Sequence, residues 1–245
     1  ILHFLGEHSG DVKDVIGTVK EYYWLIDDIS KARLSAGLSV KLTELGLDID
    51  QRYCLKNVER IAEKARAHHL FVWVDMEGSH YTDSTISVYL SAFRNHRNLG
   101  IALQSNLRRS GKDLARLLHN GGIVRLVKGA YRENDAIAFK SKAEIRGQYL
   151  MLMDTLFRKA RYFAIATHDP ELIAHAVQLS KRHRVKFEFQ LLMGIMDRRK
   201  KALVKQGFRV AEYIPYGRKW APYVWRRIRE KRSNILLVLR SLFGV

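Results

Sequence analysis

Hydrophobic and polar residues follow two different periods along this chain. Short apolar segments with strand-like alternation precede longer segments in which apolar residues recur every three or four positions, as in helices. The strand candidates are residues 2–5, 39–42, 72–76, 101–105, 123–128, 163–168, 187–192 and 209–214. The apolar positions that predict four helices include Val12, Val15, Ile16, Val19, Tyr22 and Ile26, then Leu55, Val58, Ala62 and Ala65, then Ile86, Leu90 and Phe93, then Tyr149, Leu152, Met153, Leu156 and Ala160. Asp169-Pro170 supplies an N-cap and a first-turn proline for a further helix.

Eight strand–helix units in 245 residues predict an α/β protein with a (β/α)₈ TIM-type barrel, in one domain over residues 1–245. A doubly wound open sheet is the alternative. That fold usually carries a Gly-rich GxGxxG turn after its first strand, and this turn is missing here. The barrel is therefore favoured. Because the chain begins with Ile, we expect it to be truncated at its N-terminus.

The predicted strands carry polar residues on the face that should point into the barrel. Strand side chains alternate between the interior and the surrounding helices, and barrel interiors are normally filled by branched aliphatic residues. Here the face opposite the apolar one carries Lys41, Asp75, Gln104, Arg125, His168 and Gln190, close to the carboxyl ends of the strands. Active sites of barrel enzymes lie at that end. We therefore expect these residues to line a ligand site.

Each of these residues also has a purely structural interpretation. Lys41 could pair with Asp75, and Arg125 with Glu188, since buried charges are often satisfied in this way. His168 could be a hydrogen-bonded core residue, although its place between a strand end and a helix start also suits contact with a phosphate or cofactor. Six such residues at matching strand ends favour the ligand site.

A basic helix is predicted after Pro222, near the end of the chain. Arg226 and Arg227 are adjacent in it, and Glu230 follows. An exposed basic face is the simpler interpretation. Adjacent guanidinium groups over a barrel mouth could instead bind a carboxylate with paired hydrogen bonds. With Lys41 and Arg125, such a site would be positively charged, so we expect an anionic ligand.

Composition narrows the possible classes of protein. The single cysteine, Cys54, excludes an internal disulfide, and the histidine spacings give no metal-site motif, so no metal is expected. No apolar run is long enough to span a bilayer. The net charge of +18 is compatible with an anionic membrane surface. Nucleic-acid binding is not expected, because none of the usual recognition motifs accompanies the charge.

Seven separated segments resemble, in order, the proline dehydrogenase family, and they span nearly the whole chain. They are "SVKLTELGLDID", "VDMEGSHYTD", "VRLVKGAYRE", "ATHD", "FEFQLLMG", "EYIPYG" and "PYVWRRIRE". The resemblance is to the monofunctional type. It implies a distorted barrel that binds FAD and oxidises L-proline to Δ¹-pyrroline-5-carboxylate, with electrons passing to a membrane quinone. It also implies a cytoplasmic protein, with possible peripheral contact at the inner face of the cell membrane.

The same resemblance assigns roles to individual residues. It implies that Lys41, Arg226 and Arg227 hold the proline carboxylate, that Asp75 orients Lys41 and that Glu230 braces the arginines. Tyr213 and Leu192 would pack on the substrate ring, and Arg125 would lie beside the isoalloxazine ring. The residues implied to line the flavin are Met76, Gln104, Val127, Lys128, Gly129, Ala130, Thr167 and His168.

Two other functions remain open from the residues alone. A Schiff-base aldolase or lyase could use Lys41 or Lys128 with Asp75 as a proton shuttle. A basic RNA-binding barrel without enzymatic activity is the other alternative, and it predicts binding that weakens steeply with salt.

Overall fold

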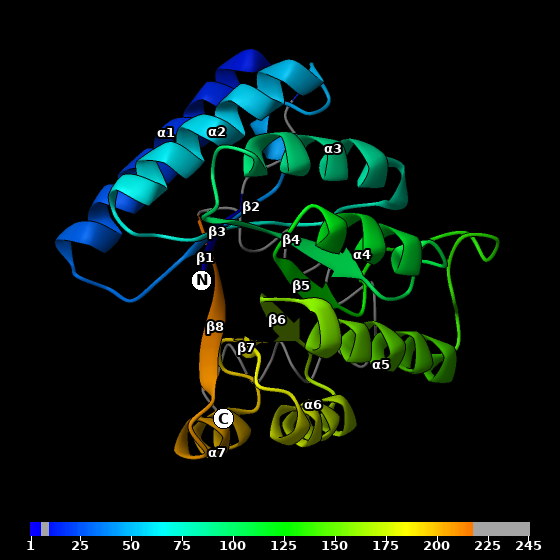
Figure 1. Cartoon of the computed structure of the whole chain (residues 1–245). Helices are drawn as coiled ribbons and strands as arrows, with labels where there is room; N and C mark the ends of the chain where they lie inside the picture. Colours follow the sequence, from blue (N-terminus) through cyan, green and yellow to red (C-terminus); the bar gives the residue numbers. More distant parts are fainter. Residues whose placement is uncertain (6–9, 218–245) are drawn as a thin grey trace. The chain divides into compact units, whose positions relative to one another are not determined.

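The computed structural model describes residues 1–5 and 10–217 (Figure 1). Its strands form a closed parallel barrel in the order β1 to β8. The strands are β1 Leu2–Phe4, β2 Leu38–Val40, β3 Val72–Val74, β4 Leu99–Gln104, β5 Val124–Val127, β6 Tyr162–Ala166, β7 Lys186–Leu192 and β8 Arg209–Tyr216. The helices are α1 Val12–Lys31, α2 Gln51–Ala67, α3 Thr82–Phe93, α4 Ser110–His119, α5 Lys142–Lys159, α6 Pro170–Arg182 and α7 Asp197–Lys205, with 3₁₀ turns η1 Thr43–Leu45 and η2 Ser79–Tyr81.

The barrel prediction and all eight predicted strands are confirmed. The main differences lie at the carboxyl ends of β2, β3 and β6, where the strands stop before Lys41, Asp75 and Thr167. The polar residues that we placed on the last strand positions therefore lie in the loops that follow. In barrel enzymes the loops at this end carry the functional groups, because their backbone is not constrained by the hydrogen bonds that pair the strands.

The chain forms two compact units. One comprises Ile1–Ala102 and the end of β8, and the other comprises Leu103–Ile214. The prediction of one catalytic domain over residues 1–245 stays a prediction.

In the first unit, β1, β2 and β3 pair in parallel and α1, α2 and α3 lie beside one another. The register aligns His3 with Ser39 and Ser39 with Trp73, so these side chains share one face of the sheet. The helices begin at side-chain caps: Asp11 accepts from Lys13 N, and Asp50 accepts from Tyr53 N. Burial of the helix faces and of this sheet face fixes the positions of the loops after β2 and β3.

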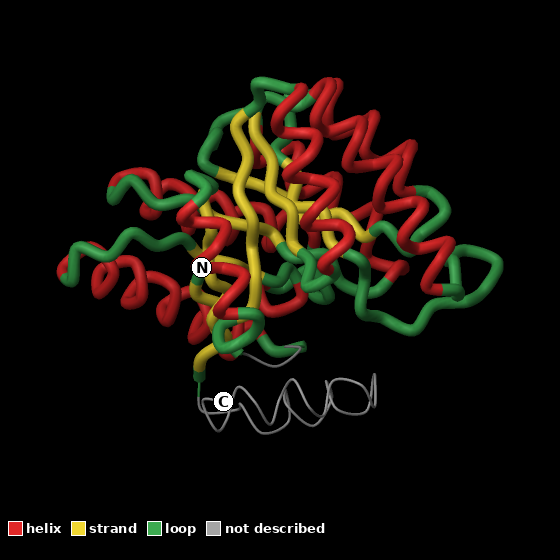
Figure 2. The backbone as a smooth tube through the Cα atoms, turned by 90° about the horizontal axis from the view of Figure 1, so that it is seen from below, coloured by secondary structure: helices red, strands yellow, loops and turns green. Residues whose placement is uncertain are grey.

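In the second unit, β5, β6 and β7 pair in parallel with α4, α5 and α6 nearby. Figure 2 shows the helices in red alongside the yellow strands. The register places Arg125 beside Ala164 and Val127 beside Ala166. Small side chains next to a long guanidinium leave it room. The predicted Asp169-Pro170 helix start is also confirmed, because the Asp169 side chain caps α6.

Within the described residues, no helix combines the length and apolar character that crossing a bilayer requires. The predicted arginine helix after Pro222, with Arg226, Arg227 and Glu230, lies outside the described residues.

Candidate active site

In the first unit, Lys41 follows β2 and its ammonium lies between two side chains. Nζ is 3.1 Å from His3 Nε2 and 3.5 Å from Glu44 Oε1. The Lys41 side chain is 15% exposed, whereas those of His3 and Glu44 are only 1% and 2% exposed. Lys41 is thus a cation at the edge of the interior, held from the buried side.

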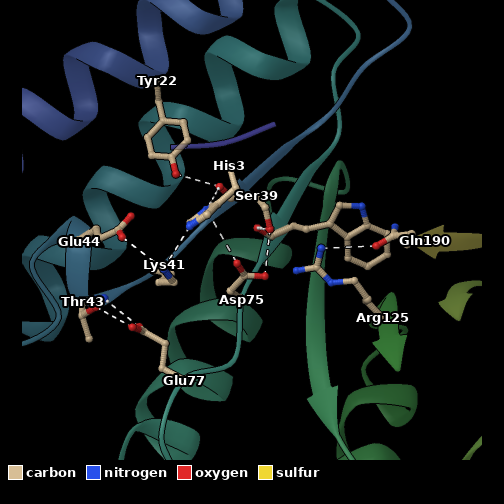
Figure 3. Close-up of polar contacts among 11 residues, drawn as sticks. His3, Tyr22, Ser39, Lys41, Thr43, Glu44, Asp75, Glu77, Arg125 and Gln190 are labelled. Atoms are coloured by element: carbon tan, nitrogen blue, oxygen red, sulfur yellow. Dashed lines mark hydrogen bonds and ion pairs between the residues drawn. The ribbon is translucent and has the colours of Figure 1, made fainter. Parts of the chain in front are cut away.

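Asp75 lies in the loop after β3, close to the same histidine. It accepts a hydrogen bond from Ser39 Oγ at 3.0 Å, and its Oδ2 is 3.9 Å from His3 Nδ1. Figure 3 shows the His3 ring between Lys41 and Asp75. We expected Asp75 to orient Lys41, and the structure supplies a histidine that contacts both of them.

Two buried carboxyl groups flank the 3₁₀ turn after Lys41. Glu77 accepts from Thr43 Oγ1 at 2.7 Å and from the Thr43 backbone N–H at 3.2 Å. Glu44 has fewer partners, and its Oε2 is buried with no hydrogen-bond partner among the described residues. Burial raises the pKa of Glu44 to about 7, with Glu77 and Asp75 also raising it and Lys41 opposing them. Glu44 therefore changes charge near neutral pH.

In the second unit, Arg125 is buried on β5, at 3% exposure. Its Nη1 donates to Gln190 Oε1 at 3.4 Å, and its guanidinium carbon lies 5.6 Å from the centre of the Tyr213 ring. Gln190 Nε2 in turn donates to Glu188 Oε1 at 2.7 Å. The Glu188 carboxylate that we considered as a direct partner is thus linked to Arg125 through Gln190. This series of hydrogen bonds fixes the Arg125 cation on the inner face of β5.

Lys128 belongs to a network of charges at the carboxyl ends of β5 and β6. Its Nζ lies 2.6 Å from Asp169 Oδ2, which Arg146 also contacts at 3.0 Å. Burial alone would raise the pKa of Asp169, but Lys128 and Arg146 outweigh it and lower the pKa. Asp169 is therefore ionised while it caps α6, and it holds Lys128 in place.

His168 is neutral in this environment. The backbone N–H of Leu192 donates to its Nε2 at 3.0 Å, so that nitrogen carries no proton. Burial, together with the nearby cations Lys200 and Lys128, lowers the pKa of His168 to about 4. With Nε2 acting as an acceptor, the ring proton resides on Nδ1.

Gly129, which follows Lys128, allows a close approach of the chain to Asn106. Its φ is +97°, and a Cβ added there would lie only 2.0 Å from Asn106 Oδ1. Glycine is thus required both by conformation and by space. Asn106 Oδ1 is buried and has no hydrogen-bond partner among the described residues. A buried acceptor without a donor is unusual, and a bound ligand could supply that donor.

The other predicted residues lie at the ends of strands or in the loops that follow them, except Tyr213, which lies within β8. Met76, Gln104 and Thr167 are buried, Val127, Leu192 and Tyr213 are half-buried, and Ala130 is exposed. Two residues that sequence reasoning missed are His3 and Glu44. His3 did give a signal, since it is a single polar residue within the apolar strand "LHFL", the same signal that identified Arg125.

A closed parallel barrel with buried charged side chains at and beyond its strand ends is the architecture of a (β/α)₈-barrel enzyme. The sequence profile described as "Proline dehydrogenase" matches residues 1–238. The chain therefore belongs to the proline dehydrogenase family and is an oxidoreductase of that family. This confirms the resemblance on which the residue roles were assigned.

Individual relatives agree with the family match. The chain is 34% identical over 244 residues to proline dehydrogenase 1 of Bacillus subtilis (strain 168), covering 98% of this chain and 81% of that protein. It is 33% identical over 249 residues to a proline dehydrogenase of Deinococcus radiodurans, covering 98% and 80%. A solved structure of Bradyrhizobium japonicum proline utilization A superposes with a TM-score of 0.85 at 22% identity, covering 98% of this chain and 29% of that one. This last likeness supports the barrel fold.

Proposed function

We propose that this protein oxidises L-proline to Δ¹-pyrroline-5-carboxylate with FAD as its cofactor, in one catalytic domain. The observation that carries the proposal is the family match over residues 1–238. The buried cations agree with it, since substrate carboxylate and reduced flavin are both anionic. FAD, when bound, would accept the hydride from the substrate carbon.

Lys41, with Arg226 and Arg227, would bind the substrate carboxylate. His3 and Glu44 contact the Lys41 ammonium on its buried side. The Lys41 side chain therefore has little conformational entropy left to lose when it binds the substrate. Glu230 would brace the two arginines, and Tyr213 and Leu192 would contact the pyrrolidine ring. A fixed carboxylate restricts the orientation of the ring carbon that reacts.

The residues predicted to line the cofactor would suit a flavin. Arg125 is a fixed cation, and a reduced flavin carries negative charge that such a cation stabilises in the transition state and in the product. The buried acceptor Asn106 Oδ1 and the Gly129 backbone offer a polar surface that a side chain would otherwise fill. The residues that would line the cofactor are Met76, Gln104, Val127, Lys128, Gly129, Ala130, Thr167 and His168.

Neutral His168 would act as a hydrogen-bond donor to the cofactor. Because Nε2 accepts the Leu192 N–H, Nδ1–H is available as a donor to an anionic or carbonyl group of the cofactor. Asp75 would act on the substrate side through Ser39 and His3, by holding the array around Lys41 rather than by removing a proton from carbon. No strong base is needed at that carbon, because hydride departs with its electron pair.

The electrons would pass to a membrane quinone, and the protein would work in the cytoplasm, in peripheral contact with the inner face of the cell membrane. The net charge of +18 supports attraction to anionic lipid. Salt-sensitive sedimentation with anionic vesicles is expected, and sedimentation that ignores both salt and lipid charge would contradict this contact.

Turnover with an artificial acceptor tests the reaction itself. Protein supplied with FAD should reduce a dye when L-proline is added, and Lys41→Met should raise the KM for proline while FAD remains bound. Borohydride trapping of a lysine adduct with a keto acid, without proline-dependent dye reduction, would instead favour a Schiff-base enzyme.

A further inference from the structure

We propose that His3 is a positioning residue: its imidazole holds the Lys41 ammonium in the orientation that binds the substrate carboxylate. This inference rests on the proposed function for the identity of the substrate. It rests on the structure for the contact itself, a 3.1 Å approach of Lys41 Nζ to His3 Nε2. Figure 3 shows the two side chains facing each other.

The hydrogen bonds determine which tautomer of His3 makes this contact. Nδ1 lies 3.0 Å from the backbone carbonyl oxygen of Ser39, which can only accept, so Nδ1 carries a proton. Lys41 can only donate, so the facing Nε2 must offer its lone pair. His3 is therefore a neutral bridge from the β2 backbone to the lysine.

A neutral acceptor has a consequence that a carboxylate would not have. A carboxylate in contact with Lys41 offsets part of the charge of the ammonium when it is ionised, whereas the neutral imidazole of His3 orients the ammonium without reducing its charge. Among the described residues, Lys41 has one further partner, Glu44, at 3.5 Å. Two of the three ammonium protons are thus directed at His3 and Glu44, and the third is left for the substrate.

Burial restricts the movement of the His3 side chain. The His3 side chain is 1% exposed and aligned with Ser39 in the sheet register, so it cannot follow Lys41 into solvent. Asp75 Oδ2 lies 3.9 Å from Nδ1 on the opposite side, and Ser39 Oγ donates to Asp75. Lys41, Ser39 and Asp75 all face the His3 ring, and their contacts favour the Nδ1–H tautomer.

Two substitutions separate positioning from a structural role. In His3→Asn, the amide nitrogen can replace Nδ1 and keep the bond to the Ser39 carbonyl, but the side chain is too short to reach Lys41. In His3→Gln, the amide oxygen can replace Nε2 and still accept from Lys41. The matched control is His68→Asn, since His68 is half-buried and contacts Ser30 Oγ at 3.0 Å, on the helical side of the same unit.

The first measurement follows Lys41 without any substrate. Reductive methylation followed by peptide mass spectrometry gives the labelling rate of Lys41 relative to exposed Lys56 in the same sample. Loss of a hydrogen bond to a charged group should speed Lys41 labelling about tenfold in His3→Asn. His3→Gln and His68→Asn should stay close to the unsubstituted protein.

The second measurement is the steady-state oxidation of L-proline. His3→Asn should raise KM about tenfold with a smaller change in kcat, and His3→Gln should recover most of the affinity. Unchanged labelling and KM in His3→Asn would overturn the inference, as would equal losses in both His3 variants. If the labelling pattern is as expected but the protein does not oxidise proline, the contact between His3 and Lys41 is supported and the proposed substrate is contradicted.

Discussion

Glu44 should make the stability of this protein depend on pH in an unusual direction. Its pKa rises from 4.5 to about 7 in the folded protein, chiefly through burial. Between those two values, the folded state holds a proton that the unfolded state has released, so the free energy of unfolding falls as pH rises. Below pH 4.5 both states are protonated, and above pH 7 both are ionised, so the effect is confined to that window.

The size of the effect follows from the pKa shift. Each pKa unit corresponds to about 1.4 kcal/mol, so Glu44 should lower the free energy of unfolding by about 3 kcal/mol between pH 4.5 and pH 7. Glu44→Gln keeps the shape of the side chain and cannot ionise. The free energy of unfolding of the variant should therefore not show this decline. From pH 5 to pH 8 it should fall less than that of the unsubstituted protein.

Urea unfolding followed by circular dichroism at pH 5, 6, 7 and 8 measures this difference directly. Glu63→Gln, on the exposed face of α2, is the matched control and should leave the pH dependence unchanged. Parallel stability curves for Glu44→Gln and the unsubstituted protein would refute the reasoning, because they would mean that Glu44 is ionised at pH 5 despite its burial.

Further predictions concern the cofactor side. Arg125→Met should slow flavin reduction by L-proline about 100-fold in stopped flow, because a fixed cation is lost, while Tyr213 and the fold remain. An unchanged reduction rate would contradict the electrostatic role. Gly129→Ala should abolish FAD binding in equilibrium dialysis, because its Cβ would collide with Asn106. Gly121→Ala also has positive φ but no atom within 4 Å, so FAD retention there and loss in Gly129→Ala separates collision from backbone strain.

Sequence periodicity was sufficient to predict the barrel, for a physical reason. Parallel strands buried on both faces are short apolar runs, and the helices between them repeat every three to four residues, so both elements leave a clear pattern. Arg125 was found because a charge within such a run is costly unless it has a partner. The strand ends were less certain, since Asp75 and His168 could equally well be the last strand residues or the first loop residues.

The partners of the charged residues could not be predicted from the sequence. The contact between His3 and Lys41 depends on the register of β1 against β2, and the pair formed by Lys128 and Asp169 joins the ends of two strands. Nothing in a single sequence specifies these distances. His3 stands out in the sequence as a single polar residue within "LHFL", but only the geometry shows that it contacts Lys41.

The anaerobic visible spectrum tests the central claim most directly. Purified protein supplied with FAD should show a bound-flavin spectrum, and L-proline added without oxygen should bleach it, with Δ¹-pyrroline-5-carboxylate formed in equal amount to the flavin reduced. A protein that never retains flavin, or a flavin spectrum that L-proline leaves unchanged, would contradict the account.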